Sequence, residues 1–147
     1  MSALHAKHLP ILSLEVVGAA HKFASTSGRR SMPDPTRIQR RRERGWRMPA
    51  GAVYVGRLSA WGNPWRAEVV DGVGWCCTDT RTGTIDPAST AAEAHSVAVE
   101  HYRAWLARHP DLTAEAARAQ LRGKPLCCWC PEHLPCHADL LLTIANA

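Results

Sequence analysis

The alternation of apolar and polar positions predicts β-strands in the middle and near the end of the chain. Short runs of β-forming residues over 52–56 and 125–129 indicate two buried strands. Residues 65–70 and 75–80 flank a glycine-containing turn at 71–74, which predicts a β-hairpin.

Helical periodicity is clearest from residue 90 onward. Thr90 and Glu93 match a capping box, and apolar stripes then continue through residues 91–109 until a proline stops the helix. A second helix is predicted over residues 113–121, and a third over 137–146. The chain therefore alternates strands with helices, which indicates an α/β fold.

The segment over residues 36–47 is rich in arginine around Ile38 and Trp46. Thr36 can cap a short helix there, and Gly45 can end it. A short helix is therefore expected before the first predicted strand.

A chain of 147 residues fits one domain. We expect a single small α/β domain over residues 32–147, with a mixed sheet of three to five strands, about three helices and a basic N-terminal segment. Residues 1–31 end in a small, polar and basic run that can bury little apolar surface. They are expected to form a flexible or loosely attached extension.

Charge is concentrated in the first part of the chain. The net charge of +5 divides into +8 over residues 1–57 and −3 over residues 58–147. Clustered arginines favour a polyanionic partner such as nucleic acid, because they displace condensed counterions from phosphates, although a solvated tail would have the same composition. The candidate nucleic-acid-binding residues are Arg37, Arg40, Arg41, Arg42, Arg44 and Arg47.

Hydropathy and the distribution of the cysteines indicate the cellular compartment in which the protein is expected. No apolar run approaches the roughly 20 residues that span a bilayer, so no membrane association is expected. The six cysteines occur in adjacent groups rather than spread along the chain as in a secreted disulfide scaffold. A cytoplasmic protein with reduced thiols is therefore expected.

Four cysteines lie within residues 127–136, where a predicted strand ends and a predicted helix begins. Three interpretations remain open. Cys128, Cys130, Cys136 and His137 offer three thiolates and an imidazole, a set suited to zinc, although the spacing differs from that of common zinc knuckles.

The second interpretation is nucleophilic chemistry. A thiol at a helix N-terminus has its thiolate favoured by the helix dipole, which makes Cys136 a candidate nucleophile. His133 or His137 would then be its base, and Asp139 would orient that base. In the third interpretation, the cysteines are small residues packed in the core.

A second group of candidate residues follows the first buried strand. Arg57, Ser59, Trp61 and Asn63 offer a guanidinium, a hydroxyl, an indole and an amide, which can hold a phosphate and a base or sugar. A plain turn covered by tryptophans is the alternative. If the two buried strands are parallel neighbours, their following loops meet at one sheet edge and form one site.

The chain resembles a family of short bacterial and phage proteins described as a domain of unknown function. The resemblance rests on the motifs R-x-S-x-W-G-N-P, beginning at Arg57, and L-R-G-K-x-L-x-C-W-C-x5-C-H-x-D, beginning at Leu121. It spans about residues 32–146. The resemblance marks Arg122 and Lys124 as further site residues but implies no activity.

These features together lead us to expect a nucleotide- or nucleic-acid-associated protein, with modifying activity left open. Arg57 and Lys124 would hold phosphate, and Trp61 or Asn63 would contact a base or sugar. The alternative is a non-catalytic, zinc-stabilised module that binds nucleic acid through its basic segment.

Overall fold

The computed structural model describes residues 35–147. The extension expected over residues 1–31 lies outside the described residues. The expected α/β class with three helices is confirmed, but the strands form two three-stranded sheets instead of one mixed sheet. The elements are β1 (Arg37–Gln39), β2 (Val53–Tyr54), β3 (Trp65–Val70), β4 (Gly74–Asp79), β5 (Ile85–Pro87), α1 (Ala91–Leu106), α2 (Ala114–Leu121), β6 (Leu126–Cys128) and α3 (His137–Asn146).

The first sheet is parallel and has the strand order β1-β6-β2. Its central strand, β6, is buried at every residue, as expected for a strand with neighbours on both sides. The predicted parallel pairing of the strands near residues 53 and 126 is confirmed, with Tyr54 opposite Cys127. The carboxyl ends of the three strands therefore share one edge.

The prediction of a short helix over residues 36–45 is wrong, because this segment begins as strand β1. Ile38 pairs with Cys127 in the ladder, and the backbone N–H of Arg40 donates to the carbonyl of Cys128 at 2.7 Å. Like-charged arginines on one helical face would repel each other, whereas strand pairing satisfies the backbone and lets the following arginines reach solvent.

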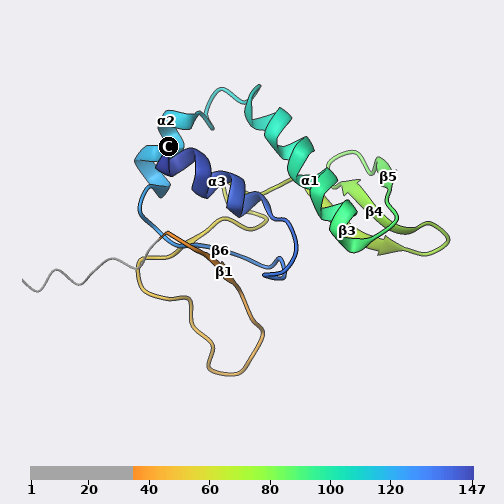
Figure 1. Ribbon diagram of the computed structural model, residues 1–147, viewed down its shortest axis with the longest axis horizontal. Helices are drawn as coiled ribbons and strands as arrows, with labels where there is room; N and C mark the ends of the chain where they lie inside the picture. The colour runs from red at the N-terminus through yellow and green to blue at the C-terminus, as the bar shows by residue number, and fades with distance from the viewer. Residues whose placement is uncertain (1–34) are drawn as a thin grey trace, which may run out of the picture. The chain divides into compact units, whose positions relative to one another are not determined.

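The second sheet is antiparallel, with the order β3-β4-β5, and confirms the predicted hairpin. Helix α1 packs against β3 and β4 (Figure 1). Its capping box is also confirmed, because the backbone N–H of Glu93 donates to the Thr90 hydroxyl at 3.1 Å. The carboxylate of Glu93 in turn accepts from the backbone N–H of Ser89.

Helix α3 packs against β6 and β1, and α2 packs against α3 (Figure 1). The core between them is built from buried residues that include Val55, Tyr102, Leu121, Leu126 and Leu141. Within residues 35–147, no helix combines the length and the apolar character needed to cross a bilayer.

Candidate metal centre and adjoining cleft

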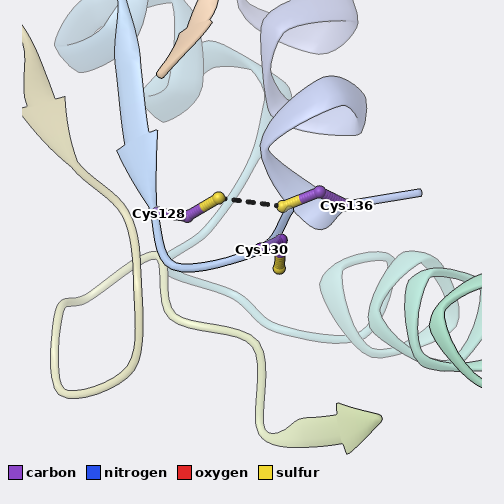
Figure 2. Close-up of side chains that lie close together, drawn as sticks. All are labelled: Cys128, Cys130 and Cys136. Carbon is purple, nitrogen blue, oxygen red and sulfur yellow. Dashed lines mark hydrogen bonds between the residues drawn. The ribbon is translucent and has the colours of Figure 1, made fainter. Parts of the chain in front are cut away.

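Three cysteines converge at the carboxyl edge of the parallel sheet. Cys128 ends strand β6, Cys130 lies in the following loop, and Cys136 caps the N-terminus of α3 (Figure 2). Their Sγ atoms all lie within 4.8 Å of one another, and those of Cys128 and Cys136 are 3.1 Å apart. This arrangement offers three thiolates to one metal ion.

The ionisation of one thiol in the cluster opposes the ionisation of another. Hydrogen bonding from Cys130, and then from Cys136, lowers the pKa of Cys128 to about 4. The same hydrogen bond to Cys128, together with Cys136 and burial, raises the pKa of Cys130 well above its ordinary value. One thiolate is therefore stabilised by its neighbours, and a bound metal ion would favour ionisation of the other thiols.

His137 is not a member of the three-cysteine cluster, although we expected it to be a ligand. Its Nε2 atom lies 2.6 Å from the carbonyl oxygen of Val55, which can only accept, so Nε2 carries the proton. Its Nδ1 atom lies 3.6 Å from the sulfur of Cys136. The carbonyl of Val55, rather than the expected Asp139, therefore orients the imidazole.

Asp139 instead forms an ion pair with Arg37, with Nη1 and Oδ2 3.0 Å apart. Burial raises the pKa of the Asp139 carboxyl, and this effect exceeds the lowering by Arg37. The expectation that Asp139 orients a catalytic base is corrected by this pairing.

Arg37 is the main site residue that the sequence analysis placed elsewhere. Its side chain is only 9% exposed, and its guanidinium donates to the carbonyl of Leu134 at 2.9 Å, to that of Pro131 at 3.3 Å and to that of Glu132. Burial lowers its pKa, but the negative charges of Asp139 and the nearby thiols outweigh burial and raise it. Arg37 therefore braces the cysteine loop and is not free to contact nucleic acid.

A cleft of about 300 Å³ lies beside the cysteines. Its walls come from the loop after β2, from β3, from α1 and from the loop between β6 and α3. Arg57, Cys130 and His137 all line it, so the expectation that the two loops share one cleft is confirmed. Cys136 also contributes to the wall, whereas Cys128 lies behind it in the core.

His95 lines the same cleft from helix α1, and the sequence analysis did not identify it. Its Nδ1 atom lies 3.0 Å from the carbonyl oxygen of Pro135 and therefore carries the proton, which leaves Nε2 unprotonated in the neutral ring. Burial lowers its pKa and so favours the neutral form. The sequence signal that could have identified His95 is its position as a polar residue next to the buried stripe of Ala94, Ala98 and Tyr102 on α1.

The W-G-N-P residues hold the loop in place. Trp61 is 3% exposed and donates from Nε1 to the side chain of Gln120 at 2.9 Å. Asn63 donates to the carbonyl of Ala98 and accepts from the backbone N–H of Trp65. Trp61 is buried and does not line the cleft, which corrects the expectation that it contacts a base or sugar. Asn63 does line the cleft, so its contact with a ligand stays a prediction.

Ser59, Arg122 and Lys124, the remaining predicted ligand-binding residues, do not line the cleft, whereas Asn63 does. The hydroxyl of Ser59 donates to the carbonyl of Gly56 within the turn. Lys124 donates from Nζ to the carbonyl of Gln120, and Arg122 is the C-cap that follows α2. Arg122 and Lys124 precede β6, so they lie at the amino end of that strand, opposite the cysteines, and the expected basic rim from Lys124 is absent from the lining.

The other predicted nucleic-acid-binding arginines follow β1 in the connection to β2, and all are exposed. They are Arg40, Arg41, Arg42, Arg44 and Arg47. Arg41 pairs with Glu43 at 3.5 Å.

Comparison with known proteins gives a family but no relative of known activity. No curated protein and no solved structure matches the chain. A family model matches residues 38–147, which include the cysteine cluster, the W-G-N-P loop and every wall of the cleft. On that match, the chain belongs to the family described as Domain of unknown function (DUF4326).

Proposed function

We propose that this chain is a zinc-binding protein whose thiolate centre forms one wall of a binding cleft for a nucleotide or a nucleotide unit of a nucleic acid. The observation that supports the proposal is the convergence of three cysteine sulfurs within 4.8 Å of one another, with Cys130 and Cys136 also lining the cleft. Three thiolates suit zinc, and three protein ligands leave a coordination position for water or substrate, as in catalytic zinc sites.

The charge of the cleft supports an anionic ligand. Arg57 and Arg66 both line it, and none of the described residues in its walls is a carboxylate, although Arg66 also pairs with Glu68 on the same strand. Guanidinium groups bind phosphate with charge-assisted hydrogen bonds. A volume of about 300 Å³ lies at the lower end of the range for small-molecule sites and suits part of a nucleotide.

The arrangement also supports a modifying reaction on the bound nucleotide. Bound zinc would act as a Lewis acid or lower the pKa of a coordinated water. His95 would supply the proton-accepting group, because its Nδ1–H is held by Pro135 and its Nε2 remains free to accept. A thiolate centre needs reduced cysteines, which accords with a cytoplasmic location.

Metal analysis tests the proposal directly. Protein purified under reducing conditions without added metal should contain about one zinc per chain. Replacing Cys128, Cys130 or Cys136 by serine should remove most of it. Cys127→Ala is the matched control, because Cys127 neighbours the cluster but is not a member of it, and this variant should keep its zinc. Metal below a tenth of an equivalent in the unaltered protein would overturn the zinc proposal.

A non-catalytic, zinc-stabilised module that binds nucleic acid is the second candidate. The link that Arg37 makes between the cysteine loop and α3 favours it, because such bracing is expected around a structural metal. The two candidates differ in the binding of nucleoside monophosphates. If the cleft binds a nucleotide, nucleoside monophosphates should bind the unaltered protein and should bind Arg57→Ala more weakly. If the protein is a non-catalytic module, neither the unaltered protein nor Arg57→Ala should bind them measurably.

A further inference from the structure

Trp129 is an exposed aromatic residue at the edge of the cleft. It follows β6 directly, the residue is 38% exposed, and it contributes to the cleft wall. An indole left partly in water beside a binding cleft is available to stack against a ligand.

Two arginines already lie over this indole. The Cζ atoms of Arg40 and Arg42 lie 4.9 Å and 5.1 Å from the centroid of the Trp129 ring. Arg40 also lies 5.2 Å from the ring centroid of Tyr54 on β2. This aromatic–arginine group therefore extends across the carboxyl ends of all three parallel strands, next to the cleft.

We call Trp129, Tyr54 and the exposed arginines of the β1–β2 connection the rim, of which Arg40 and Arg42 contact the Trp129 ring. The arginines of the rim carry little compensating charge. Among residues 35–147, Arg41 forms an ion pair with Glu43, whereas Arg40, Arg42, Arg44 and Arg47 have no carboxylate within ion-pair distance. Sites for single-stranded nucleic acid combine two components, which are guanidinium groups without a carboxylate partner and an exposed aromatic ring. The cations contact phosphates, and the ring stacks with a base whose face a duplex would hide.

We infer that this rim binds a single strand of nucleic acid, with the guanidinium groups of Arg40 and Arg42 moving from the Trp129 ring to the phosphates and a base stacking on the ring in their place, while Arg44 and Arg47 add further contacts to the backbone. Since Trp129 also lines the cleft, the nucleotide next to the stacked base enters the cleft. The inference rests on the proposed function, because it identifies the ligand of that cleft as one unit of a longer strand.

Fluorescence anisotropy on the full, zinc-containing chain tests this inference. The probes are 12-nucleotide DNA and RNA strands of one mixed sequence and the corresponding duplexes, each measured over a series of salt concentrations. We expect the single strands to bind at least tenfold more tightly than the duplexes. The stronger of the DNA and RNA signals identifies the natural strand.

Substitutions separate stacking from charge. Trp129→Ala should weaken single-strand binding about 10- to 100-fold with little change in salt dependence, and Trp129→Phe should keep most of the affinity. Arg40→Ala combined with Arg42→Ala should reduce the slope of log affinity against log salt by about 1.4. Arg108→Ala, which changes an exposed arginine just beyond the end of α1, should change neither quantity.

Two results would overturn the inference: duplexes that bind as tightly as single strands, or Trp129→Ala with unchanged affinity and normal zinc content. The measurements also separate it from the proposed function. A protein that contains zinc but does not bind single strands would contradict the inference and would still support the metal centre. Single-strand binding that depends on Trp129 in a protein without zinc supports the rim and removes the metal centre.

Discussion

A single arginine organises the cysteine cluster without belonging to it. The guanidinium of Arg37 donates to three carbonyls of the loop that separates Cys130 from Cys136 and pairs with Asp139 on α3. A planar group with five donors can satisfy several acceptors at once, which a lysine cannot do. The loop between the two cysteines is therefore held from one side by strand β1.

Replacing Arg37 by alanine should lower the free energy of unfolding by about 2 kcal/mol, because loop carbonyls lose a charged donor and Asp139 loses its partner. Arg41→Ala, which removes an exposed pair with Glu43, should change it by less than about 0.5 kcal/mol. Urea denaturation of the zinc-containing protein measures both. Equal small effects would show that Arg37 does not brace the loop.

At the scale of elements, the loop from β2 to β3 is fastened to two helices. Tyr102 of α1 donates its hydroxyl to the carbonyl of Trp61 at 2.7 Å, and the indole of Trp61 donates to Gln120 of α2. Asn63 adds a second bond to α1. The W-G-N-P motif thus fixes the backbone that presents Arg57 to the cleft.

Gly62 permits the tight packing inside this loop. A Cβ atom there would lie 2.7 Å from the carbonyl oxygen of Gly56, so the backbone would have to move. We expect Gly62→Ala to destabilise the fold by about 1–3 kcal/mol and to weaken nucleotide binding by displacing Arg57.

Gly51→Ala is the control for this substitution. Its φ of 82° makes alanine strained, but its Cβ would meet nothing within 4 Å and Gly51 does not line the cleft. Both variants should therefore lower the midpoint of thermal unfolding. Only Gly62→Ala should also weaken monophosphate binding, and Gly51→Ala should leave it unchanged. Gly62→Ala with unaltered binding would contradict the role given to the loop.

At the scale of the whole molecule, local patterns predicted the helices and the hairpin, and strand topology predicted the shared cleft. The orientation of individual side chains was not predictable. Nothing in the letters W-G-N-P distinguishes an indole facing Gln120 from one facing a ligand. Arg37 and His95 were missed or misassigned because their partners, at Leu134 and Pro135, are distant in sequence.

The pH dependence of stability should report the burial of His95. Burial lowers its pKa below the ordinary value near 6.5, so the unfolded chain binds a proton at a pH where the folded chain does not. Its contribution to stability is therefore complete above about pH 6.5 and is lost as the pH falls through the folded pKa.

We expect the urea midpoint of His95→Gln to fall less between pH 7.5 and pH 5 than that of the unaltered protein. His133→Gln, which changes an exposed histidine of the cysteine loop, should retain the unaltered dependence. Because all three proteins carry the same cysteines, comparing them subtracts the effect of acid on the metal. Identical curves for the unaltered protein and His95→Gln would refute this account.

The position of β6 in the parallel sheet has a consequence for the order of folding. Among residues 35–147, β1 and β2 pair only with β6, which follows β2 by about seventy residues in the chain. During synthesis, β1 and β2 therefore cannot pair until β6 has been made, whereas the β3–β4 hairpin and α1 can form from local contacts. Closing this long loop should be the slow step in folding, and the cysteines that follow β6 should be the last part of the molecule to come together.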